Sequence, residues 1–130
     1  MARIISQGSL RQRLPRVEAP AHLKWIRTLP CLITGRRTGI EAAHIRYGDH
    51  RYGKRSTGMA EKPDDRWSVP LHHSVHRTGP SAQHGVNERH WWDDRMIDPL
   101  MIAEELWRVS GDDDLGFATI RGKRPIKTGD

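Results

Sequence analysis

The spacing of apolar side chains predicts two amphipathic helices. Residues 20–29 begin with a proline suited to a first helical turn and stop at Pro30. Their apolar side chains recur three or four positions apart, at Leu23, Trp25, Ile26 and Leu29. Residues 99–110 follow Asp98, a good capping residue, and precede Gly111. The predicted buried face of this second helix consists of Leu100, Ala103, Leu106 and Trp107.

Two short apolar runs between these helices predict a β-hairpin. The first covers residues 31–35 and the second covers residues 40–48. The segment between them begins and ends with glycine and carries two arginines and a threonine, a composition typical of a turn. We therefore expect these two runs to pair with each other.

A long polar segment follows the predicted hairpin. Residues 46–66 are basic and rich in glycine, without a hydrophobic period. A loop of about twenty residues in a small domain is more often functional than idle. A brief apolar run comes next at residues 67–71, and Ser81 is a candidate cap for a helix that reaches about Arg95.

These elements predict one small domain of the α+β class. The 130 residues suffice for a single modest core. Residues 1–17 are basic and lack sustained periodicity, so we expect an N-terminal arm before a domain at residues 18–110. Residues 111–130 start with acidic positions and end in a basic stretch with proline and glycine, which predicts a flexible C-terminal tail.

The composition favours a cytoplasmic protein. A single cysteine, Cys31, excludes an intrachain disulfide framework. No stretch reaches the roughly 20 apolar residues of a membrane span, so we expect no membrane partner. The mean hydropathy of −0.75 is low, but large tryptophan side chains help to build a core. They are Trp25, Trp67, Trp91, Trp92 and Trp107.

Positive charge is concentrated in the first part of the chain. Residues 1–77 hold 15 basic against 6 acidic side chains, whereas residues 78–130 hold 7 against 10. Such an excess suggests a polyanionic partner, because neutralising phosphates releases counterions. A basic surface that only keeps the protein in solution is about equally consistent with the charge alone.

The distribution of histidines is the strongest chemical signal. His72, His73, His76 and His84 fall within thirteen positions, and His44 stands alone in an earlier apolar run. Neutral imidazole binds divalent metals and acts as a general base near neutral pH. Hydrolysis of a phosphodiester needs such a base, a metal and a docking surface for the backbone.

Each of these histidines also has a simpler interpretation. His44 taken alone is more often a core histidine bonded to the backbone. His72 and His76 are four apart and share a face only if they lie on a helical turn. His84 and Glu88 have the same spacing, which suits metal chelation but also suits an ordinary surface contact.

Taken together, the motifs resemble a known family. The order LPCLITG, AAHIRYG, a glycine-rich loop, KPDDRWSVPL, HHSVH and QHGVNERHWW is similar to that of HNH (ββα-metal) nucleases of phages and prophages, especially the recombination-enhancement nuclease group. The resemblance covers about residues 13–108. It implies a ββα-metal core with flanking helices, in which a hairpin and a helix hold one divalent metal ion.

The resemblance also implies a role for individual residues. His44 matches the general base that deprotonates the attacking water, and Asp65 falls near the middle motif position that orients the base or the hairpin. His76 matches the metal-binding histidine of the helix. His84 is the next candidate ligand, and Glu88 and His72 complete the set. The metal is Mg²⁺, Mn²⁺ or Zn²⁺.

Two features of the sequence depart from the family pattern. Many relatives have a metal-binding residue just before the first motif histidine, where this chain has Ala43, so His44 is alternatively a ligand. Many relatives also hold a structural zinc with two pairs of ligands. The corresponding positions here are Cys31, Thr34, His72 and Val75. Because a four-ligand site cannot be built from these residues, we expect no structural zinc.

Basic side chains surround the predicted hairpin and loop and are expected to contact phosphates. They are Arg36, Arg37, Arg46, Arg51, Lys54, Arg55 and Lys62. Nothing resembles a base-reading helix, so low sequence specificity is expected. The expected partner is DNA, with RNA as the alternative, and the resemblance adds a role in phage recombination or DNA processing with a recombination-protein partner.

Three functions remain open from the sequence. The first is a metal-dependent endonuclease that hydrolyses DNA. The second is a non-catalytic nucleic-acid-binding protein derived from an HNH nuclease, suggested by Ala43 and the missing zinc ligands. The third is a protein in which Cys31 and the later histidines hold a metal for folding only. The oligomeric state does not follow from the sequence.

Overall fold

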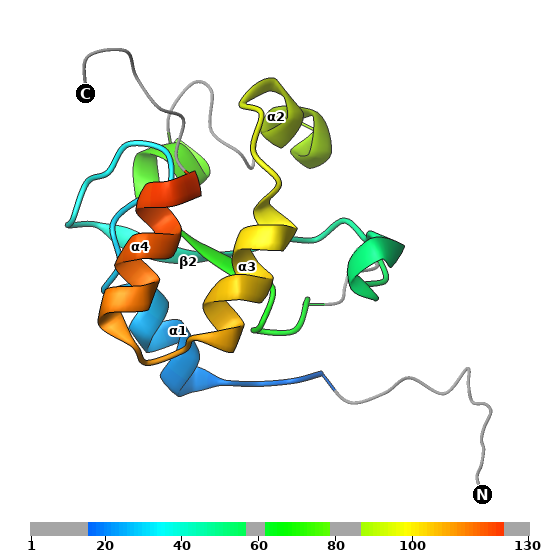
Figure 1. Ribbon diagram of the computed structural model, residues 1–130. Coiled ribbons are helices and arrows are strands. Elements are labelled where there is room, and N and C mark those ends of the chain that lie inside the picture. The colour runs from blue at the N-terminus through cyan, green and yellow to red at the C-terminus, as the bar shows by residue number, and fades with distance from the viewer. Residues whose placement is uncertain (1–15, 57–61, 79–86, 124–130) are drawn as a thin grey trace, which may run out of the picture.

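The computed structural model of the protein describes residues 16–56, 62–78 and 87–123 (Figure 1). At its centre, strands β2 and β3 form a two-stranded antiparallel sheet. The described elements are α1 (Pro20–Ile26), β2 (Ile40–His44), η1 (His50–Tyr52), β3 (Ser68–His72), η2 (Ser74–Thr78), α2 (Glu88–Asp94), α3 (Pro99–Arg108) and α4 (Asp113–Lys123). The protein therefore belongs to the α+β class, as predicted.

The pairing of the strands differs from the prediction. β2 pairs with β3, so that Ile40 lies opposite His72 and His44 opposite Ser68. The predicted first strand, residues 31–35, forms a hydrogen-bonded turn instead, and its contact with the sheet is a bond from Leu32 N to Pro70 O of 2.9 Å. Because proline has no N–H to return this bond, the ladder does not extend to residues 31–35.

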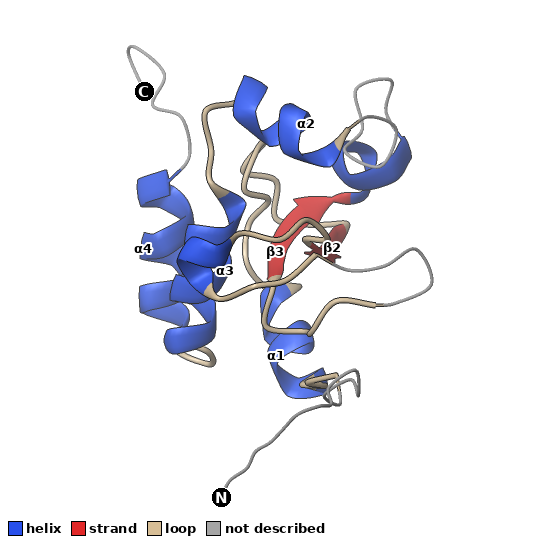
Figure 2. Ribbon diagram, turned by 90° about the vertical axis from the view of Figure 1, so that its right-hand side faces the viewer, coloured by secondary structure: helices blue, strands red, loops and turns tan. Residues whose placement is uncertain are grey.

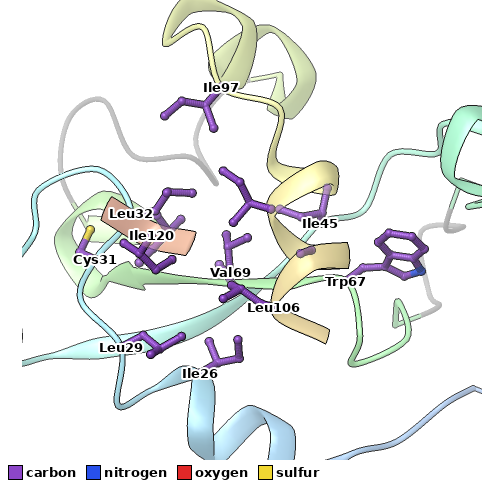
Figure 3. Packing of buried hydrophobic residues seen from close by; sticks show 14 of the residues in the cluster. Ile26, Leu29, Cys31, Leu32, Ile45, Trp67, Val69, Ile97, Leu106 and Ile120 are labelled. Carbon is purple, nitrogen blue, oxygen red and sulfur yellow. The ribbon is translucent and has the colours of Figure 1, made fainter. Parts of the chain in front are cut away.

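Helices cover the sheet and enclose the core. Figures 1 and 2 show α3 and α4 side by side, with α1 and α2 at opposite ends of the molecule. Figure 3 shows Leu106 and Ile120 around Val69 of β3. On α3, the predicted face is buried at Leu100, Ala103 and Leu106. Trp107 is only half-buried, and Ile102 is buried in its place.

The predicted flexible tail is wrong for residues 113–123, which form α4. Ile120 is fully buried, and the indole Nε1 of Trp25 donates to Asp113 Oδ1 at 2.9 Å. Gly116 allows the close approach, since a Cβ there would lie 2.6 Å from Trp25 Cζ2. The acidic run at the start of this segment suggested a flexible tail. In the structure it caps the helix instead, because Asp112 Oδ1 accepts a hydrogen bond from the backbone N–H of Leu115 at 3.1 Å.

The segment before α1 is tied to the domain. Val17 N donates to Asp64 Oδ1 at 2.8 Å, and Asp65 N donates to Val17 O at 3.0 Å. The end of the predicted arm is thus part of the described fold, and residues 1–15 lie outside the described ranges.

The helix predicted from Ser81 is confirmed only in its last part. Ser81 lies outside the described residues, and α2 begins at Glu88, where Asn87 Oδ1 accepts from His90 N at 2.9 Å. Across the described ranges, no helix combines the length and apolarity that crossing a membrane requires.

Candidate functional site

His44 is the last residue of β2, and its imidazole contacts a buried carboxylate. Nε2 of His44 lies 2.9 Å from Asp65 Oδ1. The His44 side chain is 26% exposed, whereas the Asp65 side chain is 3% exposed. Ser68, opposite His44 in the sheet, donates from Oγ to Asp65 O at 2.9 Å and so fixes the loop that carries the carboxylate. The two residues predicted to be catalytic are therefore brought together.

Asp65 is the centre of a hydrogen-bond network. Its Oδ1 also accepts from Arg16 Nη2 at 2.9 Å, and its Oδ2 accepts from Ala19 N at 2.7 Å. Burial alone would raise the pKa of Asp65, but the bonds from Ala19 and His44 and the charge of Arg16 outweigh burial and lower the pKa. The carboxylate is consequently ionised at neutral pH.

This network determines which nitrogen of His44 carries the proton. An ionised carboxylate can only accept hydrogen bonds, so Nε2 of His44 must donate. In the neutral imidazole the lone pair then lies on Nδ1, by inference from the network. Within residues 16–56, 62–78 and 87–123, no side chain or backbone group bonds to Nδ1 of His44. The arrangement can accept a proton from a bound water.

A second cluster forms around Glu41, which the sequence analysis did not identify. Glu41 Oε1 lies 2.7 Å from His76 Nδ1, and Glu41 Oε2 accepts from Arg77 Nη2 at 2.6 Å. The hydrogen bond from Arg77 lowers the pKa of Glu41, and His76 acts in the same direction. An acid inside the apolar run IEAAH was the available signal, because a carboxylate there needs a partner.

The two clusters face different sides of the sheet. In a regular strand successive side chains alternate between faces, so residues three apart, such as Glu41 and His44, point to opposite sides. His76, bonded to Glu41, belongs to the Glu41 side. This geometry separates the predicted base from the predicted metal ligand of the helix.

The remaining predicted ligands have separate partners. His72 Nδ1 lies 2.8 Å from Ser74 Oγ, and His72 Nε2 lies 3.4 Å from Arg36 Nη1. Glu88 Oε1 accepts from Arg46 N at 3.1 Å, and burial raises the pKa of Glu88. His84 lies outside the described residues, so a metal site that includes it stays a prediction.

No described group of three histidine, cysteine or acidic side chains is arranged to hold a metal ion. His72, His76 and Glu88 are each engaged by a different partner, so the described residues do not fit the single metal site that the resemblance implied. We therefore assign no coordination geometry to them.

Among the predicted phosphate contacts, Lys54 differs from the rest. It is 6% exposed, and its Nζ donates to Tyr47 O at 2.8 Å and to Arg55 O. Burial lowers the pKa of Lys54 to about 8. Lys54 thus fixes the loop from inside, and the prediction that it contacts phosphate is wrong. Exposed side chains of the set are Arg36, Arg37, Arg51, Arg55 and Lys62, and Arg46 is half-buried.

Comparison of the chain with protein-family models, with curated proteins and with solved structures finds no match. The resemblance to HNH nucleases therefore stays a prediction.

Proposed function

We propose that this protein is an endonuclease that hydrolyses DNA phosphodiester bonds with low sequence specificity, with His44 as general base and Asp65 as the residue that orients it. The observation that carries the proposal is the 2.9 Å contact between a partly exposed imidazole and a buried, ionised carboxylate. This pairing leaves Nδ1 of His44 able to accept a proton.

The chemistry follows from this arrangement. Nδ1 of His44 takes a proton from water, the water oxygen attacks phosphorus, and the bond from phosphorus to the leaving oxygen breaks. The leaving oxygen takes a proton from solvent. Asp65 stabilises the imidazolium that forms, as an orienting carboxylate does in other histidine-based hydrolases. Arg46, two residues after His44, and the exposed arginines balance phosphate charge.

The proposed nuclease uses a divalent metal ion, and only the resemblance to HNH nucleases suggests this ion. Glu41 and His76 are chemically suited to bind one, but Arg77 holds an oxygen of the carboxylate, and more ligands would be needed. No step of the reaction is assigned to a metal. Titration of Mg²⁺, Mn²⁺ and Zn²⁺ in the cleavage assay tests this part.

The second candidate is a non-catalytic nucleic-acid-binding protein. It is favoured by the engagement of His72, His76 and Glu88 with partners inside the protein. Salt-sensitive DNA binding without cleavage under any of the three ions would support this candidate.

The deciding experiment measures nicking of supercoiled plasmid by the wild type, His44→Ala and a matched control, His90→Ala. His90 is a largely exposed histidine on α2, and its Nε2 lies 3.3 Å from Asp94 Oδ2. The proposal expects that His44→Ala loses about 10²–10⁴-fold in rate and that His90→Ala is unchanged. Equal rates for the wild type and His44→Ala would show that His44 is not the base.

A further inference from the structure

A cavity of about 320 Å³ is lined by residues of the segment after β2, of α2 and of the turn between α2 and α3. Tyr47, which forms part of its wall, is three residues beyond His44. A fully extended chain rises about 3.3 Å per residue, so the Cα atoms of His44 and Tyr47 lie at most roughly 10 Å apart. This distance corresponds to a few nucleotides of a strand positioned at His44.

Hydrogen bonds from several elements hold the cavity wall in place. The carbonyl of Tyr47 accepts from the buried Nζ of Lys54 at 2.8 Å, and Glu88 accepts from the N–H of Arg46. The hydroxyl of Tyr52 donates to Asp98 Oδ2, and Asp98 also lines the cavity. The wall is therefore formed before any ligand binds, as is usual for small-molecule sites.

The lining combines a small apolar part with both signs of charge, which include the ion pair of Arg51 with Asp49 and the carboxylate of Asp98. Tyr47 and Ile97 supply the apolar part, and the guanidinium of Arg89 lies 5.3 Å from the centre of the Tyr47 ring. Asp93, also in the wall, is exposed, and no described residue donates to its carboxylate. Aromatic and arginine planes that adjoin a hydrogen-bond acceptor suit a nucleobase with an amino group.

Met96, at the rim of the cavity, has an unusual conformation. Its φ of 58° lies in the left-handed region that favours glycine, and its side chain is 92% exposed. Glycine would adopt this turn between α2 and α3 without strain, yet the chain has Met96 there, with its long apolar side chain exposed to solvent. Apolar side chains of this kind enter gaps between base steps in proteins that distort nucleic acids.

We propose that the cavity receives one unpaired nucleobase of the substrate strand while Met96 fills the gap left in the base stack. The base lies against Tyr47 and Ile97, Arg89 neutralises the adjoining phosphate, and Asp93 accepts from the exocyclic amino group. This inference rests on the proposed nuclease function and narrows its substrate to DNA with unpaired or easily unpaired nucleotides. Bases with an exocyclic amino group, namely adenine, cytosine and guanine, are preferred over thymine, which has none.

The test measures binding in the His44→Ala background, so that the strand is not cut. The probes are a short duplex with one 2-aminopurine opposite an abasic position and the same duplex fully paired. We expect the first duplex to bind about tenfold more tightly by fluorescence anisotropy, because stacking one base on an aromatic surface is worth roughly that much. Stacking on Tyr47 is also expected to quench the 2-aminopurine fluorescence.

Variants separate the cavity from general binding. Met96→Gly, which suits the positive φ and keeps the fold, and Arg89→Gln are expected to reduce the tenfold preference to about twofold. The controls Met101→Ala and Arg108→Gln change residues of the same types on α3 that do not line the cavity, and they should keep the preference.

The outcomes distinguish this inference from the nuclease proposal. Binding of both duplexes with equal affinity, or a preference unchanged in Met96→Gly and Arg89→Gln, overturns the base site and leaves the nuclease proposal standing. Failure to bind either duplex removes both.

Discussion

Replacement of Asp65 by asparagine tests the central interaction of the site. The side chain keeps its shape but loses its charge, and one of its two acceptor oxygens becomes an NH₂ group. In the native protein these oxygens accept from His44, Arg16 and Ala19. At least one of these donors therefore loses its partner in Asp65→Asn.

The expected loss of stability follows from those bonds. Hydrogen bonds to charged groups contribute about 1.5–3 kcal/mol each, so one or two lost bonds cost about 2–4 kcal/mol at pH 7. The folded pKa of Asp65 is lowered, so this stabilisation is present above its unfolded pKa of about 3.9 and is lost as the pH falls through the folded pKa. The stability difference between the wild type and Asp65→Asn should consequently narrow below about pH 4.

Asp65→Asn is expected to slow cleavage by more than its loss of stability alone would explain. An amide facing Nε2 of His44 can donate to it, which moves the imidazole proton to Nδ1 and blocks the base. The cleavage rate should fall by about 10²–10⁴-fold under conditions where Asp65→Asn is still folded.

The assay combines urea unfolding at pH 7 and at about pH 3 with plasmid nicking at pH 7. Asp64→Asn is the matched control, because Asp64 accepts one exposed bond from Val17 N at 2.8 Å, and its loss should cost no more than about 1 kcal/mol. A stability difference between the wild type and Asp65→Asn that is absent at pH 7, or equally large at pH 3, would refute the electrostatic reasoning. Unchanged nicking would refute the orienting role.

Three further predictions concern the core and the buried ionisable groups. Gly116→Ala places a Cβ 2.6 Å from Trp25 and should destabilise the protein by about 1–3 kcal/mol in urea unfolding, whereas Gly122→Ala, with nothing within 4 Å, should stabilise it by about 0.5–1 kcal/mol. Burial lowers the folded pKa of Lys54 to about 8, so the unfolded chain binds more protons than the folded chain between pH 8 and about 10.4. Stability should therefore rise with pH over this range by roughly 3 kcal/mol in the wild type and not in Lys54→Met. Burial lowers the pKa of His22, so wild-type stability should fall as the pH drops below about 6.5, and thermal melting at pH 7 and 5 should show a smaller loss in His22→Phe.

Periodicity predicted the helices better than it predicted the strand pairing. The spacing of apolar residues around Trp25 and Leu106 fixes a buried face whatever the helix packs against. Strand pairing depends on which segments of the chain meet in the fold. Residues 31–35 contact β3 through Leu32 and Pro70, and because Pro70 has no N–H to donate, these residues do not become a strand of the sheet. α4 was missed because the acidic start and the basic end with proline and glycine of residues 111–130 suggested a flexible tail, whereas Asp112 caps the helix and Trp25 packs against Gly116.

Of the candidate site, the pair of His44 and Asp65 could be predicted from the sequence, whereas the cluster around Glu41 could not. The resemblance implies that Asp65 orients His44 or the hairpin, and His44 Nε2 lies 2.9 Å from Asp65 Oδ1. Glu41 was missed because its partners, His76 and Arg77, are more than thirty positions away, and spacing along the chain carries no information about such a contact.

The bond between Trp25 and Asp113 has a consequence for synthesis of the protein. The helix that carries Trp25 leaves the ribosome long before the helix that covers it, so the nascent chain displays an indole and its apolar neighbours until α4 emerges. A chain that ends just before residue 113, through a stop codon or a protease cut, would lack α4 and would keep Trp25 and its apolar neighbours exposed. Such shortened chains should be recognised by chaperones and degraded even though the residues of the His44 site are intact.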